Sequence, residues 1–257
     1  MSEEELIYRV EERIAFLTIN REAKRNSISP EVTRACHRYL EAAENDKEVR
    51  AVCITGAGEK AFCSGADLGG AGMVSDGLDA FQDYANLLKR ISSYPKPSVA
   101  RVNGHCLAGG TGFMLACDIV VAADHARFGT PEVNVGLFPL MIGALIFRNV
   151  MRKKTMEMCL LGEKLTAQQA LEMGMVTRVV PAGRLDEEVG AILKNLAGKS
   201  PIGMKIGKEA FYKMADMPFE EAVDYLCGQL GTIAATEDAK EGIMAFLEKR
   251  EPNFTGT

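Results

Sequence analysis

Strand patterns and helix patterns alternate through the first two-thirds of this chain, and this alternation limits its possible folds more than any other feature. A short edge strand is predicted at residues 6–10. Apolar runs typical of buried strands follow at residues 14–19, 49–55, 98–102, 119–122 and 176–180. Strand, helix and strand at this spacing indicate crossover connections, which join parallel strands. The sequence therefore predicts an α/β protein with a largely parallel sheet.

A helix is predicted to begin at Ser29, a typical helix-capping residue that directly precedes Pro30. After Pro181 the strand patterns stop and only helix patterns remain. Apolar residues recur at helical spacing within residues 185–196, 223–234 and 239–247. A helical C-terminal region of this kind either packs against the core or binds another subunit.

The composition is that of an ordinary globular protein, with 47% hydrophobic and 25% charged residues, and excludes a disordered, collagen-like or coiled-coil chain. The formal net charge is -5, whereas dedicated nucleic-acid binders are usually basic, so nucleic acid is not expected as a partner. The N-terminus is acidic, unlike a secretory signal, and glycines break the longest uncharged stretches before they could span a membrane. We therefore expect a cytoplasmic protein without membrane association.

The cysteine and histidine patterns argue against a metal site and a disulfide framework. The seven cysteines are odd in number, form no C-x-x-C pair and mostly have apolar neighbours. None of the three histidines pairs with another at the helical spacing of metal ligands. Reduced core thiols and no bound metal are therefore predicted.

Two segments rich in small residues follow predicted strands, at residues 61–68 and 103–118. In the second, Gly109 and Gly110 open an apolar helix, whose first N–H groups are unsatisfied and carry positive partial charge. Because glycines allow close approach and no lysine accompanies them, this arrangement suits a developing oxyanion better than a phosphate. The alternative is that the two glycines only allow tight packing of strand and helix.

Glu132 is a single carboxylate within an apolar stretch, since no other acid occurs from Val133 to Met156. Burial disfavours the charged form and raises the pKa of such a carboxyl group towards neutral pH. A carboxyl group of this kind can move a proton to or from carbon. The alternative is a glutamate that lies at the surface or caps a turn.

These three segments, in this order, resemble the crotonase superfamily, also called the enoyl-CoA hydratase/isomerase family. Asn26 after Lys24 and Arg25, and the ending at residues 236–250, extend the resemblance over nearly the whole chain. The resemblance implies a spiral of ββα units at residues 1–197 and a helical trimerisation region at residues 198–257. It also implies assembly as a homotrimer or a dimer of trimers.

By the same resemblance, acyl-coenzyme A is the substrate, and no separate cofactor is expected. The backbone N–H groups of Ala66 and Gly109 would form an oxyanion hole for the thioester oxygen, beside Glu132. Residues that would lie along the bound coenzyme A are Lys24, Ser64, Gly65, Asp67 and Leu68. Phe246 and Lys249 would approach the coenzyme A of a neighbouring subunit.

The sequence departs from typical hydratases of this family at two places. Their first glutamate lies three residues after the oxyanion-hole glycine, where this chain has Gly112. Glycine in a helix lowers stability by about 1 kcal/mol relative to alanine, so its presence at position 112 requires an explanation. Space for the substrate or a close contact with the backbone would explain it. The glycine-rich turn of typical hydratases is replaced here by the bulkier residues 139–142.

A site with a single carboxylate above an oxyanion hole limits which reactions of the family the protein can catalyse. Moving a double bond between the 3- and 2-positions needs one base, whereas hydration divides its work between two carboxylates. We therefore expect isomerisation or hydration of enoyl-CoA through an enolate, with Glu132 as the single proton shuttle. The alternatives are an acyl-CoA decarboxylase of the same fold and a non-catalytic homologue that binds coenzyme A or RNA.

Overall fold

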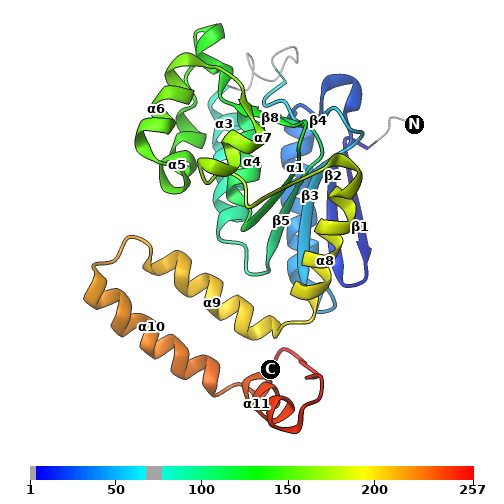
Figure 1. Cartoon of the computed structure of the whole chain (residues 1–257), viewed down its shortest axis with the longest axis vertical. Coiled ribbons are helices and arrows are strands. Elements are labelled where there is room, and N and C mark those ends of the chain that lie inside the picture. Colours follow the sequence, from blue (N-terminus) through cyan, green and yellow to red (C-terminus); the bar gives the residue numbers. More distant parts are fainter. Residues whose placement is uncertain (1–3, 68–76) are drawn as a thin grey trace.

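A six-stranded sheet forms the centre of the computed structural model, which describes residues 4–67 and 77–257 (Figure 1). The strand order is β1-β2-β3-β5-β7-β10, and every neighbouring pair is parallel except β1 and β2. The predicted parallel sheet is therefore confirmed. The strands are β1 (Leu6–Glu11), β2 (Ile14–Ile19), β3 (Ala51–Gly56), β5 (Ser98–Val102), β7 (Ile119–Ala123) and β10 (Arg178–Val180).

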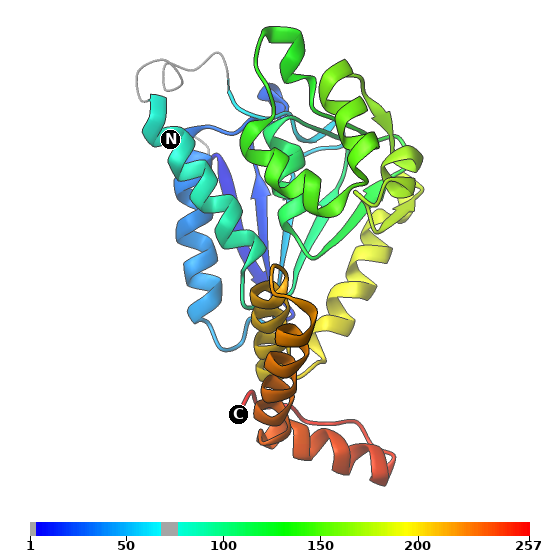
Figure 2. The ribbon, with the colours of Figure 1, turned by 90° about the vertical axis from the view of Figure 1, so that its left-hand side faces the viewer.

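Helices cover both faces of this sheet. On one face lies α8 (Leu185–Ala197), and on the other lie α1 (Pro30–Asn45), α3 (Gly77–Ser92) and α4 (Gly109–Ala116) (Figure 2). Successive residues of β3 alternate between the two resulting cores, so the whole strand is buried. This explains why the sequence of β3 reads as a continuous apolar run.

The predicted start of α1 is confirmed. The hydroxyl oxygen of Ser29 accepts a hydrogen bond of 3.1 Å from the N–H of Val32, and Pro30 is the first residue of the helix. Proline costs no hydrogen bond there, because the first N–H groups of a helix have no intrahelical partner.

A second sheet was missed by the sequence analysis, which predicted no strand in any of its four segments. Its order is β4 (Ala61–Cys63), β6 (His105–Leu107), β8 (Arg127–Gly129) and β9 (Leu165–Thr166). Strands of two or three residues are too short to show an alternating pattern. Because β4, β6 and β8 are parallel, their carboxyl ends lie at one edge of the sheet.

The two sheets give the fold its repeating ββα units. In two of these units a strand of the large sheet is followed by a strand of the small sheet and then by a helix. The pairs β3 and β4, and β5 and β6, precede α3 and α4 respectively. The remaining segments are η1 (Glu22–Lys24), η2 (Pro131–Val135), α5 (Leu140–Asn149), α6 (Arg152–Leu161), α7 (Ala167–Glu172) and η3 (Ala182–Arg184).

The C-terminal helices form an arm that leads away from the sheets (Figures 1 and 2). The arm consists of α9 (Pro201–Met214), α10 (Phe219–Ala234) and α11 (Glu237–Glu248), of which α9 was not predicted. Lys208 ties α9 to the core by hydrogen bonds to the Asp118 carboxylate and to the carbonyl of Lys96. The division of the chain at residue 198 and the oligomerising role of the arm stay predictions.

Two smaller expectations concern the cysteines and the membrane. Six of the seven cysteines are buried and unpaired, whereas Cys227 is exposed. The expectation that the cysteines lie in the core is thus confirmed for most of them, and their reduced state stays a prediction. Within residues 4–67 and 77–257, no helix combines the length and the apolar character that a membrane span requires.

Candidate active site

Three loops meet at the edge of the small sheet, because they continue from the parallel strands β4, β6 and β8. The loop after β4 is also bonded to the turn at residues 25–28. The N–H of Ile28 donates to the carbonyl of Gly65 at 2.8 Å, and the N–H of Asp67 donates to the carbonyl of Ile28 at 2.9 Å. These bonds form a single parallel bridge between Ile28 and Ala66, which fixes the position of the loop.

The first two of these loops are in direct contact at Gly65 and Gly109. A Cβ atom on Gly65 would lie 2.6 Å from the Cβ of Ala108 and 3.1 Å from the nitrogen of Gly109. Gly65 also has a φ of +92°, a conformation that other residues rarely adopt. Both observations explain why position 65 is glycine, and they show that the two loops are in contact.

Two backbone donors are left free where these loops meet. Among the described residues, neither the N–H of Ala66 nor that of Gly109 has a hydrogen-bond acceptor. Gly109 is the first residue of α4, and its N-cap, Ala108, supplies no side-chain acceptor. Unsatisfied N–H groups at the start of a helix attract a negatively charged oxygen.

Glu132 follows β8 and lies in η2. Its side chain is half-buried, and its Oε2 atom is buried without a hydrogen-bond partner among the described residues. Burial raises the pKa of Glu132 above its ordinary value of 4.5, as the sequence predicts. A carboxylate oxygen without a partner can exchange a proton with a bound molecule.

Tyr84 is a residue of this region that the sequence analysis missed. Its hydroxyl group donates a hydrogen bond to the carbonyl of Gly109, and its ring meets Phe113 edge-on at 5.7 Å. Burial raises the pKa of Tyr84 well above 10.0, and the charge of Glu132 is among the further causes. Tyr84 thus contacts Gly109 directly, and the negative charge of Glu132 disfavours ionisation of its hydroxyl group. The only sign of this role in the sequence is that Tyr84, whose side chain ends in a hydroxyl group, falls on the buried side of α3.

Gly112 is buried against other side chains. A Cβ atom at this position would lie 2.5 Å from the Cγ2 of Ile142 and 2.7 Å from the hydroxyl oxygen of Tyr84. Real Cβ atoms essentially never come so close to another atom. Close packing thus explains why this position is glycine. The contacts are with side chains, whereas the sequence led us to expect a contact with the substrate or with the backbone. A substrate contact at Gly112 stays a prediction.

Lys24 and Asp67, both predicted to lie along coenzyme A, form an ion pair of 3.1 Å. A shorter pair of 2.6 Å joins Asp67 to Arg21, whose side chain is only 7% exposed. The hydrogen bond from Arg21 is the main reason that the pKa of Asp67 lies below its ordinary value of 3.8. Arg21 was missed by the sequence analysis, and it holds the loop of Asp67 against the rest of the chain.

Asn26 fixes the turn that carries Lys24. Its side chain is completely buried and donates to the carbonyls of Ala57 and Ala61 at 2.9 and 2.7 Å. Its Oδ1 atom accepts a bond of 3.0 Å from the N–H of Arg21. Because all these groups are satisfied, the turn is held firmly beside the loop after β4.

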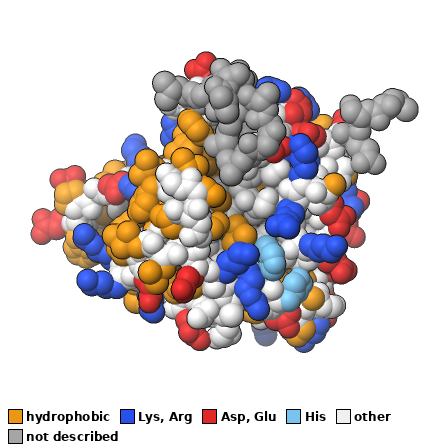
Figure 3. Space-filling model, turned by 90° about the horizontal axis from the view of Figure 1, so that it is seen from above, with side chains coloured by type: hydrophobic (Ala, Val, Ile, Leu, Met, Phe, Trp, Pro, Cys, Tyr) orange, Lys and Arg blue, Asp and Glu red, His pale blue; other side chains and the backbone are white. Residues whose placement is uncertain are grey.

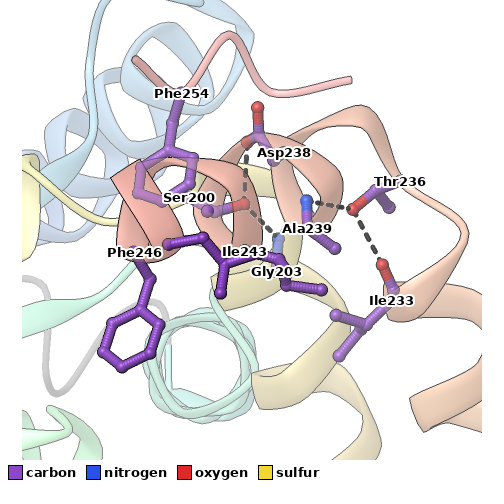
Figure 4. A pocket seen from close by; sticks show the side chains of 11 residues that line it. Ser200, Gly203, Ile233, Thr236, Asp238, Ala239, Ile243, Phe246 and Phe254 are labelled. Atoms are coloured by element: carbon purple, nitrogen blue, oxygen red, sulfur yellow. Dashed lines mark hydrogen bonds between the residues drawn. The ribbon is translucent and has the colours of Figure 1, made fainter. Parts of the chain in front are cut away.

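The other predicted site residues lie elsewhere or are not described. Leu68 lies outside the described residues. Phe246 lies in α11 and Lys249 is its C-cap, and α11 lies at the opposite end of the molecule from α5 and α6 (Figure 1). A cavity of about 370 Å³ lies among α9, α10, α11 and the C-terminal tail, with Phe246 and Phe254 at its wall (Figure 4). One chain thus does not bring Phe246 to Glu132.

An apolar surface borders the site on the side of α5 and α6 (Figure 3). Large side chains exposed there are Leu137, Phe138, Leu140, Met141, Phe147 and Leu160. Exposed apolar patches of this kind commonly mark a binding surface. Basic side chains and histidine side chains gather on the other side of the same view.

Comparison with known proteins decides the family. The model of the enoyl-CoA hydratase/isomerase family matches residues 9–257. The chain belongs to the enoyl-CoA hydratase/isomerase family. The 2,3-dehydroadipyl-CoA hydratase of Escherichia coli is 34% identical to it over 253 residues, which are 98% of this chain and 99% of the relative. The (E)-benzylidenesuccinyl-CoA hydratase of Thauera aromatica is 32% identical over 250 residues, or 96% and 97% of the two chains.

Solved structures of the enoyl-CoA hydratase/isomerase family agree with this fold. The crystal structure of an enoyl-CoA hydratase from Bacillus anthracis has a TM-score of 0.93 and 29% sequence identity. The match covers 98% of this chain and 100% of that one. The crotonase-like fold and the membership in a family of lyases and isomerases, both expected from the sequence, are thereby confirmed.

Proposed function

We propose that this family member acts on acyl-CoA thioesters through an enolate, with Glu132 as the only proton shuttle. The main support is the buried Oε2 atom of Glu132, which has no partner among the described residues. It lies on the loop after β8, beside the loops that carry Ala66 and Gly109. The carboxylate and the two free N–H groups thus belong to neighbouring loops of one sheet edge.

The N–H groups of Ala66 and Gly109 would bind the thioester oxygen. Removal of a proton next to the thioester carbon places negative charge on this oxygen. Two fixed donors at that point stabilise the charge by about 3 kcal/mol each. The contact between Gly65 and Gly109 supports this role, because it holds both donors in one place.

The reaction that a single carboxylate performs most simply is isomerisation of a 3-enoyl thioester. Glu132 would remove a proton from C2, and the electrons of the C–H bond would pass into a dienolate whose charge rests on the thioester oxygen. The carboxylic acid would then return the proton to C4, giving the 2-enoyl thioester. A raised pKa suits Glu132 to both steps, since the same group must be base and then acid.

Hydration of a 2-enoyl thioester is the second candidate, and the names of the relatives favour it. Both curated relatives above are named as hydratases of acyl-CoA substrates. In this case Glu132 alone would activate a bound water and deliver the proton to C2. The closed packing at Gly112 argues for isomerisation, because it leaves no place for a second carboxylate.

Coenzyme A would lie along Lys24 and the loop of Ser64, Gly65 and Asp67, and its phosphates would be offset by basic residues. Phe246 and Lys249 would reach the same coenzyme A from a neighbouring copy in a homotrimer or dimer of trimers. The 82% exposure of the Phe246 side chain in the single chain supports this assembly. A cytoplasmic location remains part of this proposal.

The experiment that tests the function offers 2-enoyl-, 3-enoyl- and carboxyacyl-CoA substrates in water labelled with a heavy oxygen isotope, with product analysis by mass spectrometry. Isomerisation conserves the mass and shifts the double bond. Hydration adds one labelled water, and decarboxylation releases carbon dioxide. Mass-conserving conversion of the 3-enoyl substrate as the fastest reaction would support the proposal, and a faster gain of water would favour the second candidate.

A further inference from the structure

Gly109 and Gly112 lie one helical turn apart on the same side of α4, and the space left by their missing side chains is filled by Tyr84. The hydroxyl oxygen of Tyr84 lies 3.3 Å from the position of a Cβ atom on Gly109. It lies 2.7 Å from the same position on Gly112. This space, called here the glycine groove, is therefore occupied by a phenol.

Tyr84 is held firmly in the glycine groove. Its hydroxyl group donates to the carbonyl of Gly109, and its ring packs edge-on against Phe113. Its side chain is almost completely buried in the main core, next to Leu87 and Leu88 of the same helix. A side chain held by a hydrogen bond and by core packing cannot leave the groove without disturbing α3 and α4.

Ile142 closes the glycine groove from the side of α5. Its Cγ2 atom would lie 2.5 Å from a Cβ atom on Gly112, and the Cδ2 atom of Leu88 would lie at 3.2 Å. A glutamate at position 112 therefore does not fit unless Tyr84 and Ile142 change. The family resemblance places the first glutamate of a hydratase at this position.

The phenol cannot replace the missing carboxylate as a base. Burial and nearby charges, including that of Glu132, hold the pKa of Tyr84 well above 10.0. The hydroxyl group is neutral at pH 7, and its proton is already donated to Gly109. The glycine groove thus offers no group that could activate a water molecule.

We propose that Tyr84, together with Ile142, determines the reaction specificity by closing the glycine groove to a second carboxylate and its water. The site is thereby restricted to proton transfer by Glu132. This inference rests on the proposed function, because it takes Glu132 as the proton shuttle. It adds Tyr84 and Ile142 as the residues that decide which reaction of the family this site performs.

The test changes only the two side chains whose atoms block the groove. Y84F deletes the hydroxyl oxygen, and I142L moves the blocking methyl group from Cβ to Cγ, so both changes keep most of the packing. G112E is made in the wild-type chain and in the Y84F/I142L chain, and Y84F/I142L alone is the matched control. Each variant is assayed for isomerisation and for incorporation of labelled water, and its melting temperature is measured.

We expect G112E alone to lower the melting temperature and to gain no hydration. Y84F/I142L/G112E should recover the melting temperature and incorporate labelled water at least about tenfold faster than Y84F/I142L. Equal hydration by G112E alone would overturn the proposal, and so would a folded triple variant without added hydration.

A smaller substitution keeps the proposal testable if the triple variant does not fold. G112A should lower the melting temperature in the wild-type chain and leave it nearly unchanged in Y84F/I142L. An equal loss in both chains would contradict the closed groove. Failure of the proposed function itself is seen separately, as unchanged isomerisation by the single variant E132Q.

Discussion

The Cα atom of Gly65 lies 3.6 Å from the position that a Cβ atom would take on Gly109. Through this contact the loop after β4 touches the first residue of α4, although the two glycines are far apart in the sequence. The free N–H groups of Ala66 and Gly109 are the immediate neighbours of this contact. The distance between Gly65 and Gly109 therefore determines whether both N–H groups can donate to the same oxygen atom.

Substitution of Gly65 by alanine should separate the two loops. The new methyl group would lie 2.6 Å from the Cβ of Ala108, and the φ of +92° would strain any residue but glycine. A displacement of the donors by about 1 Å is expected to lower kcat about 100-fold. The matched control is G190A in α8, where nothing lies within 4 Å and alanine should stabilise the helix. Equal kcat in G65A and G190A would contradict the predicted role of the contact.

The buried charge of Glu132 should make the protein less stable above its raised pKa. The native state holds the proton more tightly than the unfolded chain, whose pKa is near 4.5. The contribution of Glu132 to stability is therefore fully present below pH 4.5 and is lost as the pH rises through the folded pKa. E132Q, which carries no charge, should melt about 2–4 °C above the wild type at pH 8, and the difference should vanish near pH 4. Thermal melts across this pH range check the prediction, and a lower melting temperature of E132Q at pH 8 would refute it.

Asp67 should show the opposite pH dependence. Its pKa lies below 3.8 because Arg21 and Lys24 favour the charged form, so its stabilising effect is present above pH 3.8 and is lost on further acidification. D67N should destabilise the protein by about 1–3 kcal/mol at pH 7. K24A removes only the exposed partner and should cost less than about 1 kcal/mol. Denaturant titrations of both variants compare these costs, and a larger cost for K24A would show that Arg21 is not the main partner.

Lys249 and Phe246 should act on binding of the substrate and not on the chemical step. K249A is expected to raise KM for acyl-CoA about fivefold at low salt, with kcat within twofold, because an exposed charge pair contributes about 1 kcal/mol or less. F246A should raise KM in the same way by loss of an apolar contact. K240A is the control on the same helix, since Lys240 already pairs with Glu237 at 2.6 Å. An unchanged KM in both K249A and F246A would exclude the arm from the binding site.

The large sheet was predictable from the sequence because its central strands, β2, β3, β5 and β7, have five or six residues and are buried on both faces. The raised pKa of Glu132 was predictable because no acid follows it up to Met156. Both features depend on local sequence. The small sheet was not predictable, since two or three residues carry no alternating pattern, although its strands are the ones that bring the three loops together.

Tyr84 could not be predicted for a different reason. Its role depends on the packing of α3 against α4, and its hydrogen-bond partner Gly109 lies 25 positions further along the chain. Gly112 alone indicated that α4 needs space at this position, because glycine is unfavourable in a helix. The sequence could not show which side chain fills that space. Contacts of this kind are set by tertiary structure and leave no pattern in a single sequence.

The role of Glu132 as proton shuttle is tested most directly by the turnover of E132Q on the best 3-enoyl-CoA substrate. Glutamine keeps the size of the side chain but cannot exchange a proton, so kcat should fall about 100- to 10,000-fold while the affinity for acyl-CoA is retained. Measurement of acyl-CoA affinity on the same preparation shows that the site is intact. Turnover of E132Q at the wild-type rate would contradict the proposed mechanism.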